Sequence, residues 1–407
     1  MNPARLAGAF SCEGLLDAAL LSCLALVAYT YLAYPLGVGL LSAAAGRPVR
    51  PRAGPVGPVS VVIAAHNEEA LIAGRVSELA GHVAGIATGG EVIVVSDGST
   101  DRTAGRAREA DAGGVPVIVI ERPANEGKSA ALSAGCSEAR HAVVAFGDVR
   151  QKWEPGALSF LLETLSDPAV GAVGGDLVIE SAAGTLRGMG IYWSFEKWLR
   201  RRESLLHSSV GLTGAIAAVR RDLFRPPPPG TILDDVYWPL GVAMQGMRVI
   251  HDSRAVARDR LPGRARDEFR RKVRTLSGNF QLAARLPGAL DPRRNPIWLQ
   301  FASHKLLRLA VPWALIGAFV GSAIARGPWH RGAFWLQVLA YLIALAGLSG
   351  PIARRSRLAS AAGSFLVLNA AAWVAFWVWA SGRTSRTWVK ATYAAPAAPP
   401  GGTEAAG

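Results

Sequence analysis

The fold is decided by residues 59–69, which read VSVVIAAHNEE, and by residues 91–103, which read EVIVVSDGSTDRT. Each stretch begins with β-branched and small apolar residues and ends in polar ones. Apolar runs of this kind are typical of strands that are buried on both faces. Two further apolar runs, at 115–120 and 142–146, predict a third and a fourth strand.

Helical patterns separate these strands, at residues 69–83, 103–111 and 129–140. Strands that alternate with helices predict a parallel sheet covered on both faces, which is a Rossmann-like α/β domain. Ligands of such sheets bind at the carboxyl ends of the strands. The residues that directly follow each strand are therefore the first candidates for a functional site.

Three of the four strands end in polar or acidic loops. Asn67 and Glu68 follow the first strand, Asp97 follows the second and Asp148 follows the fourth. Helix capping would explain any one of these loops, because Asn, Ser, Thr and Asp are good N-caps. It does not explain why acids and amides gather at one edge of the sheet, so the pattern favours a nucleotide site.

The third helix begins at the segment NEGKS, residues 125–129, which contains Lys128. A Walker A loop would need glycine at position 122, where Arg122 stands, so a P-loop is excluded. A lysine at the start of a helix still suits a diphosphate.

Three later segments carry further candidates. Thr213 and Gly214 end the small-residue loop GLTG, which a ligand or backbone can approach closely. Asp234 and Asp235 are adjacent acids among apolar residues, and two interpretations stay open: one acid is structural and the other catalytic, or both cap the helix that follows. Residues 258–274 hold eight basic and three acidic residues, which suits anionic lipid headgroups or a diphosphate.

The composition predicts membrane segments. Half of the 407 residues are hydrophobic and only 18% are charged, which is too apolar for a wholly soluble chain. Four uncharged stretches are long enough to span a bilayer, at 18–41, 309–325, 333–350 and 359–380. A cleavable signal is the alternative for the first, but its apolar core is too long and Arg5 is the one basic residue before it. No predicted span contains a charge of the kind that lines a polar pathway.

The basic flanks predict the orientation. Arginines cluster at 47–52 after the first span and at 354–357 between the last two spans, so the segment between the first and second spans is expected in the cytoplasm. Basic residues at 383–390 conflict mildly with this orientation. The net charge of +14 does not indicate nucleic acid, because the basic stretch has one aromatic residue and adjoins a span. Three cysteines are too few for a disulfide framework.

Seven motifs together resemble the membrane-embedded family 2 glycosyltransferases, which are the cellulose, chitin and hyaluronan synthases and their bacterial relatives. In chain order they read VSVVIAAHNEE, EVIVVSDGSTDRT, NEGKSAALSAG, VVAFGDVRQ, GLTGAIAAVRRD, ILDDV and EFRRKVRTLSGNFQL. The resemblance covers residues 59–282 and implies a GT-A fold and inverting transfer from a nucleoside-diphosphate sugar, with a UDP-sugar expected.

The resemblance also implies roles for individual residues. The nucleotide-sugar ligands would be Asn67, Glu68, Asp97, Lys128, Asp148, Arg271 and Arg274, with Asn67, Glu68 and Asp97 at the base and ribose. Asp148 matches the first Asp of the DxD motif, which holds Mg²⁺ or Mn²⁺. Asp235 matches the general base, Asp234 stands where a second acid is usual, and Thr213 and Gly214 would face the acceptor.

Two departures from the family pattern bear on the chemistry. Arg150 replaces the last Asp of DxD, which puts metal dependence in question. Thr275 replaces the Trp of the QxxRW motif, where Arg274 matches the Arg, and that Trp stacks on the acceptor in processive synthases. Trp193 or Trp198 would be substitutes for this stacking face.

The expected protein is a multi-pass enzyme of the bacterial inner membrane that synthesises or extends an exopolysaccharide. Its partners would be the sugar donor, a glycan or lipid-linked acceptor, membrane lipids and other exopolysaccharide-synthesis proteins. The alternatives are transfer of a single sugar to a lipid acceptor, and a non-catalytic scaffold. The expected division is an anchor at 1–45, a linker at 46–58, the GT-A domain at 59–290, an interfacial segment at 291–305, three transmembrane helices at 306–380 and a partly disordered tail at 381–407.

Overall fold

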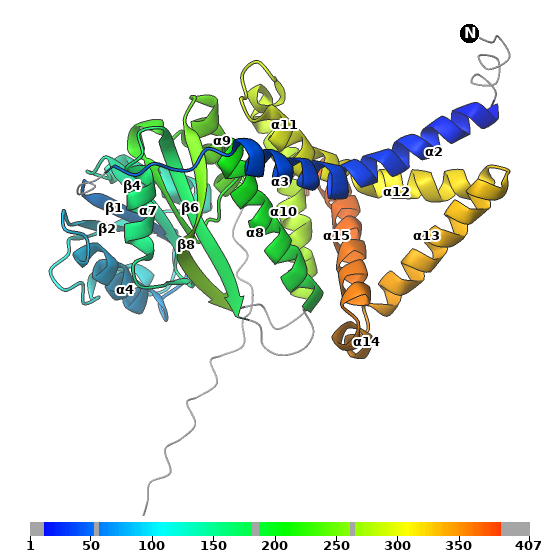
Figure 1. Cartoon of the computed structure of the whole chain (residues 1–407). Helices are drawn as coiled ribbons and strands as arrows, with labels where there is room; N and C mark the ends of the chain where they lie inside the picture. Colours follow the sequence, from blue (N-terminus) through cyan, green and yellow to red (C-terminus); the bar gives the residue numbers. More distant parts are fainter. Residues whose placement is uncertain (1–11, 53–56, 181–186, 261–264, 384–407) are drawn as a thin grey trace, which may run out of the picture.

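The computed structural model describes residues 12–52, 57–180, 187–260 and 265–383. An α/β domain forms one end of the molecule and a group of long helices forms the other (Figure 1). Residues 53–56 of the expected linker and nearly all of the expected C-terminal tail lie outside the described residues.

A single sheet of eight strands lies at the centre of the α/β domain, in the order β3-β2-β1-β4-β7-β6-β8-β5. The strands are β1 (Val59–Ala65), β2 (Gly90–Asp97), β3 (Val117–Arg122), β4 (Val143–Asp148), β5 (Lys152–Trp153), β6 (Val170–Glu180), β7 (Ile216–Arg220) and β8 (Arg248–Arg260). The four predicted strands are confirmed as β1 to β4, which pair in parallel. β7 runs antiparallel to both β4 and β6, so the second half of the sheet is mixed.

Helices cover both faces of the sheet because the apolar strands have no solvated face. Every residue of β1 is buried. Helices α4 (Ile72–Ala84), α5 (Thr103–Arg108) and α7 (Ala157–Leu165) pack on one face. Helices α6 (Lys128–Glu138) and α9 (Asp234–Met244) pack on the other. The predicted doubly covered α/β sheet is therefore confirmed.

Two amphipathic helices join the sheet to the long helices. Helix α8 (Arg187–Leu206) packs against β8 and α3, and α10 (Ala265–Arg285) packs against α15 (Figure 1). Short 3₁₀ turns η2 (Arg221–Leu223) and η3 (Pro287–Leu290) complete this part of the chain.

The long helices come from both ends of the chain. The N-terminal ones are α2 (Cys12–Ala28), the π-helical turn η1 (Tyr29–Ala33) and α3 (Tyr34–Ala45). The C-terminal ones are α11 (Trp298–Phe301), the π-helical turn η4 (Ala302–Leu306), α12 (Leu307–Ile324), α13 (Pro328–Ala346), α14 (Gly350–Arg355) and α15 (Arg357–Ala380). Helices α2 and α12 lie side by side (Figure 1).

Three helical stretches among the described residues are long and apolar enough to cross a membrane: Glu13–Ala45, Trp298–Ile324 and Arg357–Ala380. The span predicted at 333–350 falls mainly on α13, which is not one of the three because Arg331 and Gln337 reduce its hydropathy. Within the described residues the structure thus supports the expected N-terminal span and two of the three expected C-terminal spans. The second span also begins earlier than predicted, at Trp298.

Candidate active site

The loops after β1 and β2 are joined by hydrogen bonds at the carboxyl edge of the sheet. The backbone N–H of Thr100 donates to Asn67 Oδ1 at 2.8 Å, and the N–H of Asn67 donates to Ser99 Oγ at 3.2 Å. Asn67 has a positive φ of 54°, which Asn tolerates better than most residues. The N–H of Glu68 donates to Thr103 Oγ1 at 2.8 Å. Asn67 and Glu68 are therefore held at the predicted edge.

Asp97 organises the loop that leads into α6. Its buried carboxylate accepts hydrogen bonds from the N–H groups of Gly127 at 2.7 Å and Glu126 at 3.3 Å, and Arg122 lies 3.3 Å away. The neighbouring Gly98 has a φ of +62°, and a Cβ there would lie 2.3 Å from the backbone N of Asn125. The structure thus gives Asp97 a positioning role in the loop that presents Lys128.

Lys128 lies at the centre of the site. Its ammonium forms an ion pair with Asp148 and lies 3.3 Å from the carbonyl oxygen of Gly214. A Cβ at Gly214 would lie 2.7 Å from Lys128 Nζ and 3.8 Å from the Cβ of Asp235. These contacts bring together the last residue of β4, the first residue of α6 and the loop before β7. Burial disfavours the charged lysine, but Asp148, Asp234 and Asp235 outweigh it and raise the pKa of Lys128.

The acid pair occupies the first turn of α9. Asp234 is buried and Asp235 is half-buried. Burial raises the pKa of Asp234 to about 6, against the opposing effect of Lys128. Burial also raises the pKa of Asp235, while Lys128, Arg200 and Lys305 act in the opposite direction. The helix N-terminus favours negative charge there, so both interpretations of the pair are compatible with its position.

The two arginines predicted on the donor side differ in their surroundings. Arg274 lies within the electrostatic influence of Asp234 and Asp235; burial lowers its pKa, and its Nε is buried without a hydrogen-bond partner. Arg271 instead makes two hydrogen bonds to Glu268 on the same helix, at 2.8 and 3.0 Å. The structure therefore associates Arg274, but not Arg271, with the acid pair.

The acceptor-side candidates are partly engaged in turns. Thr213 Oγ1 accepts a hydrogen bond from the N–H of Ala215 at 3.4 Å. Trp198 packs against α3, because a Cβ at Gly39 would lie 3.2 Å from its ring. Trp193 lies under Lys272, whose Nζ is 4.6 Å from its ring centroid. Trp198 thus packs against α3, and Trp193 lies beside Lys272 of α10.

The protein residues alone offer too few ligands for a divalent cation. They fit such an ion only when the substrate supplies the remaining ligands. The described part of the chain has no group of three or more His, Cys, Asp or Glu side chains that could hold a metal. Asp148 offers one partly exposed carboxylate. Mg²⁺ is commonly bound by one or two carboxylates together with substrate phosphates and water, so one carboxylate and a diphosphate suffice.

Sequence reasoning missed several residues around Asp148. Arg75, which is buried on α4, donates from Nε to the carbonyl oxygen of Asp148 at 3.1 Å. Arg150 lies 3.2 Å from Asp259 on β8, and Gln151 donates to the same carboxylate at 2.8 Å. No local motif marks Arg75 or Asp259; an arginine on the apolar face of a helix pattern was the one available signal for Arg75.

Comparisons with known proteins agree with the fold of the α/β domain. Residues 60–226 match the family model Glycosyl transferase family 2. A mannosyltransferase from Pyrobaculum calidifontis, solved with GDP-Man and Mn²⁺, is 22% identical with a TM-score of 0.70, over 90% of this chain and 99% of that one. The sequence matches no curated protein.

Two further matches have lower TM-scores. Mannosyl-3-phosphoglycerate synthase from Rubrobacter xylanophilus is 19% identical over 56% of this chain and 74% of that one, with a TM-score of 0.37. Glucosyl-3-phosphoglycerate synthase from Mycobacterium tuberculosis is 23% identical over 61% and 83%, also with a TM-score of 0.37. The family match thus identifies residues 60–226 as a family 2 glycosyltransferase domain, and the α/β domain that contains them has the GT-A fold.

Proposed function

We propose that this enzyme transfers a sugar, with inversion, from a nucleoside diphosphate to a hydroxyl of a membrane-associated acceptor. The observation that carries the proposal is the meeting of Lys128, Asp148 and the acid pair Asp234–Asp235 at the carboxyl edge of the sheet. Cations for a leaving diphosphate and a carboxylate with a raised pKa are the two requirements of this transfer.

Each residue has a distinct part in the proposed reaction. Asp235 accepts the proton of the acceptor hydroxyl as its oxygen bonds to the anomeric carbon, and the bond from that carbon to the diphosphate oxygen breaks. Lys128 and Arg274 stabilise the negative charge of the departing diphosphate. Asn67, Glu68 and Asp97 form or support the nucleoside pocket, and Gly214 leaves room beside Lys128.

Asp148 would hold a divalent cation, which when bound supplies further positive charge to the diphosphate. The relative from Pyrobaculum calidifontis was solved with GDP-Man and Mn²⁺, which supports a metal and leaves both a GDP-sugar and the expected UDP-sugar as donors to test. Mg²⁺ and Mn²⁺ are both suitable for oxygen ligands of this kind.

The setting that we propose is the inner face of a bacterial cytoplasmic membrane. Support comes from the three candidate spans, and from basic residues beside two of them. The anchor would comprise residues 1–45, the catalytic domain 59–290 and the membrane region 306–380. The product that we propose is an exopolysaccharide or its lipid-linked precursor, with other proteins of the same synthesis as partners.

The test is a donor panel with purified full-length protein in detergent. Supplied with UDP- and GDP-sugars and a membrane lipid extract as acceptor, the enzyme should release UDP or GDP. The Asp235→Asn variant should lose at least about 100-fold in rate, which is the low end of what a general base contributes. The matched control is Asp222→Asn, an exposed acid on η2 that should leave the rate unchanged. Undiminished turnover by Asp235→Asn would refute the base assignment.

A further inference from the structure

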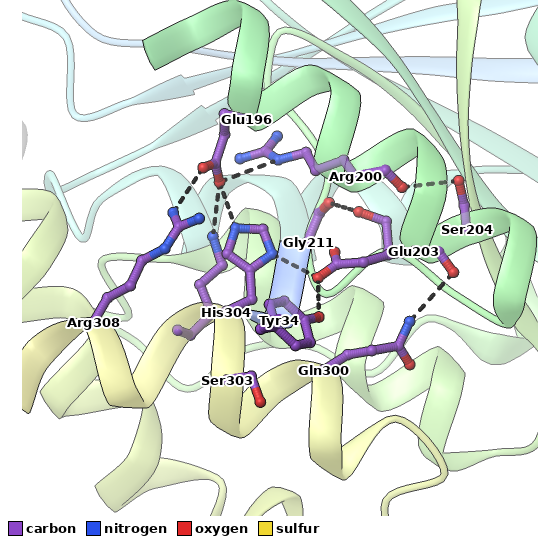
Figure 2. Close-up of polar contacts among 12 residues, drawn as sticks. Tyr34, Glu196, Arg200, Glu203, Ser204, Gly211, Gln300, Ser303, His304 and Arg308 are labelled. Atoms are coloured by element: carbon purple, nitrogen blue, oxygen red, sulfur yellow. Dashed lines mark hydrogen bonds and ion pairs between the residues drawn. The ribbon is translucent and has the colours of Figure 1, made fainter. Parts of the chain in front are cut away.

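A buried charge cluster lies where α8 meets the helix that runs through η4 into α12 (Figure 2). We define the α8–α12 charge cluster as Glu196, Arg200, Glu203, His304, Lys305 and Arg308. The three residues of α8 face the three from the candidate span Trp298–Ile324. None of the residues placed in the proposed reaction belongs to this cluster.

His304 bridges the two carboxylates of the cluster. Its Nε2 lies 2.7 Å from Glu196 and its Nδ1 lies 2.8 Å from Glu203. The hydroxyl of Tyr34 on α3 donates to Glu203 at 2.6 Å. Figure 2 shows the imidazole between the two acids, with the Arg308 side chain extended toward Glu196.

Three cationic side chains lie near the single carboxylate of Glu196. Arg308 contacts its carboxylate at 2.8 Å, Lys305 at 3.7 Å and Arg200 at 3.8 Å. Even with a neutral His304, three cations stand against the two acids of the cluster. This excess is one positive charge on partly exposed cations, and Asp235 offsets part of it, so an anion is the favoured further partner of the cluster.

Unpartnered donors in the same place point to the same conclusion. Among the described residues, four donors here, Arg308 Nε and Nη2, Arg200 Nε and Trp193 Nε1, are buried without a hydrogen-bond partner, and so is one acceptor, Glu203 Oε2. Buried donors are normally satisfied, and these four atoms come from neighbouring turns of α8 and from α12. An acceptor-rich group such as phosphate would satisfy several of them at once.

The position of the cluster connects it with the acceptor side of the site. Arg200 and Lys305 act electrostatically on Asp235, the proposed base. Lys272 on α10, within the influence of Glu196 and Arg200, lies over the rings of Tyr192 and Trp193. Beyond the cluster lie the apolar helices α3 and α12. An anion held here would be near the base. If it carried a lipid chain, that chain would lie against these apolar helices.

We propose that the α8–α12 charge cluster, with Lys272, binds the phosphate or diphosphate of a lipid-linked acceptor. This inference rests on the proposed function, because it names the acceptor class of the same site. The acceptor is thus a glycolipid whose sugar hydroxyl reaches Asp235, while its phosphate stays at the cluster and its chain lies along the apolar helices. The transfer itself breaks only the donor bond, so the lipid phosphate is retained in the product.

The test variant is Lys305→Gln, because Lys305 is a more distant partner of Glu196 than Arg308 or His304 and its loss disturbs the cluster least. The acceptors are a polyprenyl-diphosphate-linked sugar, the same sugar on a polyprenyl monophosphate, and the same sugar as a neutral alkyl glycoside. We expect the KM for the phosphorylated lipids to rise about 10-fold or more, which is the effect of one lost charge-assisted contact. The KM for the neutral glycoside, the KM for the donor and the affinity for free nucleoside diphosphate should not change.

Two further arms make the result decisive. Lys305→Arg should restore most of the acceptor affinity, and Arg331→Gln on α13, a cation remote from the cluster, is the matched control. Wild-type enzyme that uses the neutral glycoside as well as the phosphorylated lipids would overturn the inference and leave the proposed function standing. So would competition by phosphatidylglycerol but not phosphatidylcholine vesicles, since the cluster would then hold a bulk lipid headgroup. Failure to release any nucleoside diphosphate would refute the proposed function itself.

Discussion

Replacing Lys128 with methionine is the sharpest test of the electrostatics of the site. The ammonium is an ion-pair partner of Asp148 and also compensates Asp234 and Asp235. Methionine keeps much of the length and apolar volume but leaves these acids without their shared cation. Breaking a fully buried pair costs about 3–5 kcal/mol. Because the Asp148 side chain is 27% exposed, solvent screens part of this, and we expect about 2–4 kcal/mol at pH 7.5.

The loss should depend on pH in a defined direction. In the folded protein the pKa of Asp234 and the pKa of Asp235 are already above their usual 3.8, and loss of Lys128 should raise them further. Carboxyls with raised folded pKa values bind more protons in the folded state than in the unfolded state. The stability deficit of Lys128→Met should therefore shrink as the pH falls from 7.5 toward 5.

The assay is thermal unfolding of the full chain in detergent across this pH range. At pH 7.5 the Tm of Lys128→Met should be roughly 4–8 °C lower than the Tm of the wild type. Lys128→Arg, which keeps the charge, should recover most of the stability, and Lys152→Met on the exposed edge of β5 is the control for loss of a lysine elsewhere. A deficit that stays constant with pH, or one equal to that of Lys152→Met, would show that Lys128 does not compensate the acid pair.

Three other outcomes follow from the same geometry. The rate should fall as the pH is lowered from 7.5 toward 5, because Asp235 must be deprotonated and burial raises its pKa above the usual value; a flat pH–rate profile down to pH 5 would contradict the base assignment. Gly214→Ala should displace the Lys128 ammonium, 2.7 Å from the new Cβ, and lower kcat/KM with little change in Tm, whereas an unchanged kcat/KM would separate this loop from the donor site. Chelation by EDTA should abolish turnover, and added Mn²⁺ or Mg²⁺ should restore it by binding at Asp148. Full activity in EDTA would contradict a metal requirement.

The parallel half of the sheet could be predicted because its strands are continuous apolar runs. The structure moves the third strand from 115–120 to Val117–Arg122, since Pro116 has no amide hydrogen to donate to a ladder. The first helix begins at Ile72 instead of residue 69 because residues 69–71 form a turn. The strands β5 to β8 were not predicted. β5 has only two residues, β8 is interrupted by polar residues, and the four strands pair in a mixed order that only tertiary contacts define.

The charge cluster shows why hydropathy alone located the second span incorrectly. The predicted span began at residue 309 because His304, Lys305 and Arg308 interrupt the apolar run. In the structure the helix continues back through these residues to Trp298, since Glu196 on α8 balances part of their charge. A partner more than 100 positions away in the chain is invisible to a sliding window. The full candidate helix Trp298–Ile324 therefore contains charged residues that the predicted stretch 309–325 lacks.

The replacement of the second DxD carboxylate by Arg150 does not add an uncompensated positive charge beside Asp148. Asp259, on β8, lies 3.2 Å from the Arg150 guanidinium and also accepts a hydrogen bond from Gln151. Asp148, Arg150 and Asp259 together carry one net negative charge, where the same three positions with an Asp at 150 would carry three, and Asp148 is also the ion-pair partner of Lys128. The protein alone therefore attracts a cation only weakly, so the diphosphate must supply a larger share of its ligands. We therefore expect metal affinity to be weak without nucleotide and to rise strongly when the nucleoside diphosphate binds, because the ion and the diphosphate complete one another's coordination.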